Sequence, residues 1–257
     1  MKRIQEKIDE LFSMKRYPDN LFYDGDLELL KRTKISIVGS RKPSKYSRFE
    51  IQKLSSALAK RGACIVSGGA MGIDAAAHNG AGSSNTIAVL PCGIDIRYPK
   101  VNKNMLDDIG EKGLLLSQFE KGFNAAPWSF VIRNELVVAL GEVLIVGEAQ
   151  INSGTMRSVE FATMMNKDIF VLPHRLGDSS GTNDLIKKGM AEPIYDIDEF
   201  VARFFPLDVG DAKDDEFICF CETNPIYDEV LARFPNRVFE AELNGDIKVV
   251  NGRVIVL

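Results

Sequence analysis

Two glycine-rich loops carry the residues with the clearest capacity for chemistry in this sequence. The first reads Gly39-Ser40-Arg41-Lys42-Pro43-Ser44, and the second reads Ser67-Gly68-Gly69-Ala70-Met71-Gly72. Backbone N–H groups at the start of a helix attract anions, and a guanidinium such as that of Arg41 can fork onto a phosphate, although a solvated loop tip is an equal alternative for Arg41 alone. The stretch from Lys34 to Arg61 holds eight basic residues and one acidic residue. This pattern predicts a ligand that carries phosphate.

Two later segments carry side chains that suit an unpaired nucleic acid. Trp128, Phe130, Arg133 and Asn134 fall near the start of an expected helix. There an aromatic ring could stack a base while a guanidinium holds its phosphate, although core packing is an equal alternative for Phe130. Ser153-Gly154-Thr155 follows an expected strand and opens another helix, so it repeats the anion-binding geometry of the first two loops.

Other reactive residue types have simpler structural explanations. Asp74 lies in the first turn after the second loop and can cap its helix, and His78 is more consistent with a packed or hydrogen-bonded role. The only other histidine is His174, and neither has cysteines or carboxylates at ligand spacing, so no metal site is expected. The four cysteines are expected to be buried free thiols. Neither GxGxxG nor Gly-Lys-Ser/Thr occurs, so we expect no cofactor and no catalytic residue.

The elements that must position these loops alternate along the chain. Short apolar runs lie at residues 35–38, 64–66, 86–90, 114–117, 142–146 and 168–172, and helix-length segments separate them. Strands that alternate with helices form parallel βαβ units with right-handed crossovers. The sequence therefore predicts an α/β fold with a doubly wound, mostly parallel sheet, and it brings the four loops to one edge of that sheet.

We expect four parts along the chain. They are a helical and extended lead-in over 1–33, the loop-bearing domain over 34–205, a polar linker over 206–214 and a small winged-helix-like domain over 215–257. The lead-in is expected to begin with an amphipathic helix. The last part should contain two short helices over 228–233 and 238–243, followed by a hairpin whose Asn251-Gly252 turn is the strongest two-residue hairpin signal.

Charge is distributed unevenly in a chain whose net charge is −4. Residues 215–257 hold eight acidic and four basic side chains, which suits a phosphate backbone poorly because binding it requires cations. We expect this part to meet a protein partner or to help a dimer form, unless Arg233, Arg237, Lys248 and Arg253 gather on one face. No stretch approaches the roughly 18 apolar residues of a spanning helix, so we expect a cytoplasmic protein with no membrane partner.

The sequence resembles the DNA-processing protein DprA (Smf) family over most of residues 15–200. The shared segments, in family order, are IVGSRKPSKYS, IVSGGAMGIDAAAH, TIAVLPCGIDIRYP, SFVIRNELVVAL, SGTMRSVEFA and SSGTNDLIKKG. The resemblance implies an extended Rossmann-like fold that binds single-stranded DNA during natural transformation, protects it from nucleases and helps load the RecA recombinase. It also implies a homodimer that is not an enzyme.

The resemblance further implies which residues contact DNA. The expected contacts are Gly39, Ser40, Arg41, Lys42, Gly68, Gly69, Phe130, Arg133, Asn134, Ser153, Gly154 and Arg175. The sequence departs from the family where Arg133-Asn134-Glu135 replaces the usual Arg-Asn-Arg, and Arg175 is a candidate to supply the lost charge. Residues 125–128, immediately before Phe130, include no basic residue, which makes Trp128 a candidate stacking surface in place of the missing cation.

An enzymatic function is the alternative. Nucleoside-monophosphate phosphoribohydrolases of the lysine-decarboxylase-like group share this type of sheet and glycine loop, but they require a PGGxGTxxE motif. In this chain Glu160 lies too far beyond Ser153-Gly154-Thr155 to match that motif. A scaffold that binds only proteins is a third possibility, and it leaves the basic loop without an explanation.

Overall fold

The computed structural model describes residues 2–206 and 216–256 of the chain. The chain divides into two compact units, Met1–Val201 and Ala202–Leu257. Apart from Pro206, the expected linker lies outside the described residues. Within the described ranges, none of the helices combines the length and apolar character needed to cross a membrane.

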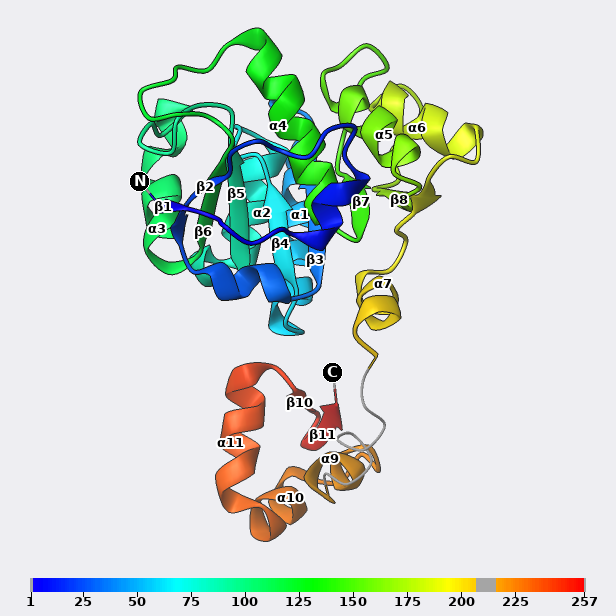
Figure 1. The fold of residues 1–257 in the computed structure, drawn as a ribbon. Helices are drawn as coiled ribbons and strands as arrows, with labels where there is room; N and C mark the ends of the chain where they lie inside the picture. Colours follow the sequence, from blue (N-terminus) through cyan, green and yellow to red (C-terminus); the bar gives the residue numbers. More distant parts are fainter. Residues whose placement is uncertain (1, 207–215, 257) are drawn as a thin grey trace. The chain divides into compact units, whose positions relative to one another are not determined.

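A nine-stranded sheet forms the centre of the first unit (Figure 1). Its strands are β1 (Lys2–Arg3), β2 (Phe22–Gly25), β3 (Lys34–Val38), β4 (Cys64–Ser67), β5 (Thr86–Leu90), β6 (Leu114–Ser117), β7 (Val143–Val146), β8 (Ile169–Val171) and β9 (Glu192–Pro193). Their spatial order is β1-β2-β6-β5-β4-β3-β7-β8-β9. Strands β3 to β9 run parallel, and β1 and β2 extend the β6 edge antiparallel. The predicted α/β fold with a mostly parallel sheet is confirmed.

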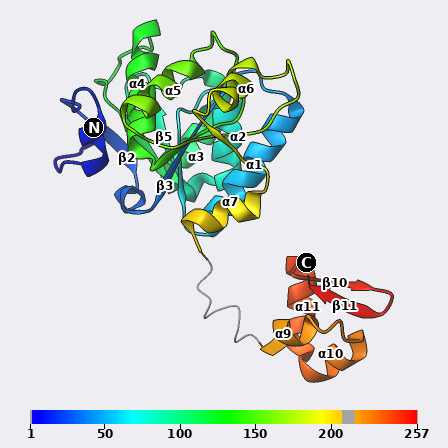
Figure 2. The ribbon, with the colours of Figure 1, turned by 90° about the vertical axis from the view of Figure 1, so that its right-hand side faces the viewer.

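Helices cover both faces of this sheet. They are α1 (Lys45–Lys60), α2 (Ile73–Ala81), α3 (Lys103–Lys112), α4 (Pro127–Leu140), α5 (Thr155–Met164), α6 (Ser180–Lys187) and α7 (Ile197–Phe204), with short 3-10 helices η1 (Asp9–Ser13), η2 (Leu27–Lys31), η3 (Ser83–Asn85) and η4 (Lys100–Asn102). Alternation along β5 shows the two faces: Ile87 and Val89 join the core that contains α4, whereas Ala88 and Leu90 join the core that contains α3. Figure 2 shows α1 and α4 on opposite sides of the sheet.

Strand order reverses at β3, and this reversal positions the site. From β3 the chain winds through β4, β5 and β6 on one side, and it then returns to place β7 on the other side of β3. The loops that follow β3 and β7 therefore leave their strands in opposite directions. In open α/β sheets this divergence creates a crevice at the carboxyl ends of the strands, where ligands bind.

The N-terminal prediction of an amphipathic helix is wrong. Lys2 and Arg3 pair with Tyr23 and Phe22 as the antiparallel strand β1, and the following turn is the 3-10 helix η1. The apolar residues that suggested a helical face, among them Leu11, instead enter the core beneath α4. Pairing with an open sheet edge outweighs the helix propensity of this short segment.

The second unit has its own small core. It contains α9 (Glu216–Cys221), α10 (Tyr227–Arg233), α11 (Pro235–Asn244) and the hairpin β10 (Ile247–Val250) and β11 (Arg253–Val256). The two predicted helices and the hairpin are confirmed, and Asn251 and Gly252 both have the positive φ that the tight turn requires. The sequence missed α9 because its FICFC run has no helical periodicity. Phe217 from α9 nevertheless fills the centre of this core.

Candidate functional site

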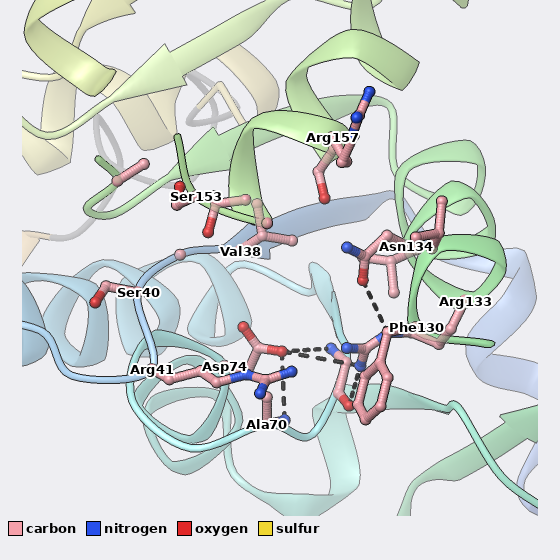
Figure 3. Close-up of a pocket in the computed structure, with 18 of the residues that line it drawn as sticks. Val38, Ser40, Arg41, Ala70, Asp74, Phe130, Arg133, Asn134, Ser153 and Arg157 are labelled. Atoms are coloured by element: carbon pink, nitrogen blue, oxygen red, sulfur yellow. Dashed lines mark hydrogen bonds and ion pairs between the residues drawn. The ribbon is translucent and has the colours of Figure 1, made fainter. Parts of the chain in front are cut away.

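A cavity of about 650 Å³ opens where the loops after β3, β4 and β7 meet the start of α4 and α5 (Figure 3). It lies at the reversal of strand order described above. Nine of the twelve residues expected to contact DNA line it: Gly39, Ser40, Arg41, Gly68, Phe130, Arg133, Asn134, Ser153 and Gly154. The loops predicted to share one edge of the sheet thus surround a single space.

The two glycine loops are packed directly against each other. The backbone N–H of Ile73 donates to the Ser40 carbonyl oxygen at 3.1 Å. Gly72 has a φ of +84°, and a Cβ atom at this position would lie 2.2 Å from the same Ser40 oxygen. A residue with a side chain would both strain the backbone and separate the loops. Gly72 therefore holds Arg41 at the edge of the cavity.

Arg133 is a buried anchor of the second loop. Its side chain is 5% exposed, and its Nη1 atom donates to the carbonyl oxygens of Gly68 and, at 3.3 Å, of Val89. The guanidinium occupies the space where a side chain at residue 68 would begin, because a Cβ there would lie 1.5 Å from Nη1. Burial lowers the pKa of Arg133, and the nearby Asp74 carboxylate acts in the opposite direction. Arg133 was expected to hold phosphate, but its Nη1 and Nε donors are already used inside the fold, Nε by the side-chain oxygen of Asn134 at 3.0 Å.

Asp74 contacts both the second glycine loop and Arg133. Its Oδ2 atom accepts from the backbone N–H groups of Gly68 at 3.2 Å and Ala70 at 3.3 Å, and it lies 4.0 Å from Nη1 of Arg133. Burial raises the pKa of the Asp74 carboxyl, while Arg133 opposes the shift. Asp74 thus ties down the loop that precedes α2, which differs from the expected role of capping that helix.

Arg41 is the free cation of the site. Its guanidinium carbon lies 5.1 Å from the centre of the Phe130 ring, and the part of the chain that the structure describes gives its guanidinium no hydrogen bond and no ion pair. Tyr98 meets the same ring edge-on at 5.7 Å. Phe130 is half-buried, so its ring lines the cavity while it also contacts neighbouring side chains. A free guanidinium beside an aromatic ring can bind a phosphate, while the ring can stack on the adjacent base.

The opposite wall offers unpaired hydroxyl groups. The Oγ atoms of Ser153 and Ser158 are buried without a hydrogen-bond partner among the described residues, and both residues line the cavity. Arg157 also lines it and forms an ion pair with Glu160 at 2.7 Å, with both side chains more than half exposed. Ser153 and Arg157 lie across the cavity from Asp74 (Figure 3). Arg157 and Ser158 were not among the residues expected from the sequence, although both lie one helical turn beyond Gly154 and so could have been placed on the same wall.

Three expected contacts lie outside the cavity lining: Lys42, Gly69 and Arg175. Lys42 is exposed, and its backbone N–H donates to the Ser40 hydroxyl at 3.1 Å. The Gly69 carbonyl faces away to accept from Asn102 at 3.0 Å. Arg175 is exposed on the loop between β8 and α6.

Glu135, which stands where the family has a second arginine, also faces away from the site. Its carboxylate accepts from the backbone N–H of Lys15 at 2.8 Å and so ties the N-terminal segment to α4. Trp128 is exposed and is not among the residues that line the cavity.

The histidine and cysteine predictions are mostly confirmed. His78 is 1% exposed, and its Nδ1 atom lies 2.7 Å from the Thr86 hydroxyl. Burial, aided by Arg133, lowers the pKa of His78 to about 3. Among the described residues none of the four cysteines forms a disulfide, but Cys219 is exposed, so the prediction of burial was wrong for that residue.

Comparison with known proteins gives a consistent family. The model of DNA recombination-mediator protein A matches residues 5–205. The DNA processing protein DprA of Streptococcus pneumoniae is 39% identical over 176 residues, which are 67% of this chain and 62% of that protein. DprA of Bacillus subtilis is 32% identical over 177 residues, which are 67% of this chain and 60% of that protein. The matched segment is therefore less than two thirds of either relative.

Solved structures agree with these matches. DNA processing protein A from Helicobacter pylori, whose single-stranded DNA binding mode has been described, is 39% identical with a TM-score of 0.77, over 79% of this chain and 94% of that one. The Streptococcus pneumoniae DprA structure is 37% identical with a TM-score of 0.71, over 75% of this chain and 69% of that one. Sequence, fold and family model together show that this chain belongs to the DNA recombination-mediator protein A (DprA/Smf) family.

Proposed function

We propose that this protein binds single-stranded DNA in the cavity at the reversal of strand order. The observation that carries the proposal is the unpaired guanidinium of Arg41 above the Phe130 ring, at the mouth of a cavity walled by glycine loops and helix starts. The Helicobacter pylori relative, described as binding single-stranded DNA, supports the same ligand class for this chain. In the cell the protein would protect incoming single strands during natural transformation and help load RecA onto them, acting as a cytoplasmic homodimer.

Each wall of the cavity has a separate role in this proposal. Arg41 neutralises a backbone phosphate, and Phe130 stacks the adjacent base, whose face is available only when the strand is unpaired. The hydroxyls of Ser153 and Ser158 and the N-terminal turn of α5 supply neutral donors for a second phosphate. None of these contacts reads a base edge, so binding should tolerate any sequence.

Fluorescence anisotropy with a labelled oligo-dT tests the proposal. The logarithm of the association constant should fall linearly with the logarithm of salt concentration, by about 0.7 for each neutralised phosphate. Arg41→Ala should weaken binding to every sequence and reduce that slope by about 0.7. Lys42→Ala is the matched control, because it removes an equal charge from the neighbouring residue outside the cavity. Normal binding by Arg41→Ala would place the site elsewhere.

We also propose that the protein is not an enzyme. The glutamate that a phosphoribohydrolase would need corresponds best to Glu160, which does not line the cavity and pairs with Arg157 on the exposed side of α5. Among the described residues that line the cavity, Asp74 carries the one carboxylate, and it is buried and accepts hydrogen bonds from the second glycine loop. Incubation with AMP should release no adenine, and released adenine that Asp74→Asn abolishes would contradict this assignment.

A further inference from the structure

Three aromatic side chains form a cluster that the proposed site does not use. We name Phe119, Phe123 and Trp128 the outer aromatic platform. The two phenylalanine rings are stacked, with centroids 4.7 Å apart and planes at 13°. The indole of Trp128 meets both edge-on, at 5.7 and 5.4 Å, and Trp128 remains 53% exposed. The indole thus packs on two phenylalanine rings and is also open to solvent, which is unusual for so large an apolar side chain.

The platform borders the cavity through α4. Pro127, Phe130 and Val131 line the cavity, whereas Trp128 does not. Residues three apart on a helix are neighbours on its surface, so Trp128 lies beside Val131 at the rim. The first turn and a half of α4 therefore presents the Phe130 ring inside the cavity and the Trp128 ring outside it.

The platform is held in place before any ligand arrives. The backbone N–H of Phe119 donates to the Ser117 hydroxyl at 3.1 Å, and the Phe123 carbonyl accepts from Gly93 at 2.9 Å. Next to Trp128 in the chain, the Ser129 hydroxyl donates to the Pro91 carbonyl at 2.7 Å and so fixes the start of α4. Because the loop and helix that carry these rings are already ordered, stacking a base on them costs little conformational entropy.

We propose that Trp128 stacks a second unpaired base of the strand whose neighbouring base occupies the cavity. This inference rests on the proposed function and adds a subsite to it. The platform has little net charge to offer, because the exposed Lys121 stands next to the exposed Glu120 in the same loop. Its contribution therefore comes from stacking and not from phosphate neutralisation, and the two can be separated by salt.

The chain provides a direct readout because Trp128 is its single tryptophan. Titration with oligo-dT, followed by intrinsic fluorescence and by anisotropy of a labelled strand, reports stacking and binding in one sample. We expect the Trp128 emission to be quenched in proportion to the bound fraction. An oligonucleotide of equal length with abasic sites carries the same phosphates without bases, and it should bind without quenching.

Variants distinguish stacking from other contributions. Trp128→Ala should weaken oligo-dT binding by about 5- to 150-fold and leave the salt slope unchanged, whereas Trp128→Phe should retain most of the affinity. The abasic strand should bind Trp128→Ala and wild type equally. Tyr195→Ala is the control, because it removes another exposed ring, 81% accessible and outside the cavity lining.

The outcomes separate this inference from the function on which it rests. If oligo-dT binds but leaves the Trp128 emission unchanged, the second subsite is wrong and the cavity proposal stands. If no anisotropy change occurs, both are wrong. An emission that responds to protein concentration instead of oligo-dT would show that a second copy of the chain covers the platform, which also overturns the inference.

Discussion

Two arginines approach the same Phe130 ring, and their surroundings give them opposite roles. The guanidinium of Arg41 lies 5.1 Å from the ring centre and is otherwise free among the described residues, whereas that of Arg133 lies 6.0 Å away and is buried against Gly68. The buried charge is compensated by Asp74 and by carbonyl oxygens. A free cation contributes to ligand affinity, while a buried and bonded one contributes to the fold.

Removing these two charges should therefore have different consequences. Arg133→Met should lower the free energy of unfolding by about 3 kcal/mol, because it leaves Asp74 buried without its cation. Arg41→Met should change stability by less than about 0.5 kcal/mol, as expected for an exposed side chain. Urea denaturation at neutral pH measures both. Equal stability of the two variants would show that Arg133 is not the anchor described here.

His78 makes stability depend on pH. Its Nδ1 donates to Thr86, whose own hydroxyl donates to Ile65, and its Nε2 is buried without a partner among the described residues. The pKa falls from 6.5 to about 3 on folding, so between these values the unfolded chain binds a proton that the folded chain excludes. Stability is then lost as the pH drops below about 6.5.

A variant isolates this histidine. Between pH 7.5 and 5, wild type should lose about 2 kcal/mol of unfolding free energy more than His78→Gln, whose amide can still donate to Thr86. Urea denaturation at both pH values gives the difference. His174→Gln is the comparison for the other histidine of the chain. Parallel losses in wild type and His78→Gln would mean that His78 ionises in the fold.

At the scale of elements, the sequence predicted the buried strands of the sheet correctly, but it did not predict the segment that pairs with the edge of the sheet. Runs such as 35–38 and 86–90 predicted strands correctly, because a parallel strand is apolar on both faces. The helix expected at the N-terminus became β1 because an unpaired sheet edge was available, which depends on the position of β2 in the fold. Likewise, Arg41 and Arg133 could be identified from the sequence, but only the packing of Gly68 shows which one is free.

Helix α1 has three exposed basic residues, which we name the basic stripe. Lys45, Arg48 and Lys53 lie on its exposed face, and Ile51 and Leu54 on its buried face. Within the described residues none of these three cations has a carboxylate in ion-pair range, unlike Lys31 and Lys188, which pair with Glu28 and Asp184. The stripe starts four residues beyond Arg41, so a bound strand can follow it.

Neutralising this stripe should weaken binding through the salt-dependent contribution alone. The triple variant Lys45→Gln, Arg48→Gln and Lys53→Gln should bind oligo-dT more weakly and reduce the salt slope by up to about 2, or 0.7 per lost contact. The double variant Lys31→Gln and Lys188→Gln should leave the slope unchanged. Anisotropy titrations at several salt concentrations provide the comparison, and an unchanged slope in the triple variant would exclude α1 from the path.

At the scale of the whole molecule, most basic side chains of the second unit make contacts within that unit. Arg233 pairs with Glu216 and lies 4.8 Å from the Phe220 ring, and Arg237 lies 5.1 Å from the Phe217 ring. Arg253 donates to the Asn224 carbonyl at 2.7 Å. All four cations in residues 215–257 are exposed, but three of them make these contacts within the unit, and Lys248 makes no ion pair or cation–π contact with the described residues.

Removing residues 207–257, which include the core of the second unit, should therefore preserve binding of single strands. Residues 1–206 contain 27 basic and 25 acidic side chains, so a chain that ends at Pro206 changes from a net charge of −4 to +2. It retains α7, whose Phe200 packs on Phe170 at 4.9 Å. Because like charge no longer repels the ligand, we expect equal or tighter binding of oligo-dT and no loss of duplex affinity. In the full chain, Lys248→Glu should also leave duplex affinity unchanged, and a marked drop in either variant would assign the second unit to DNA instead of a protein partner.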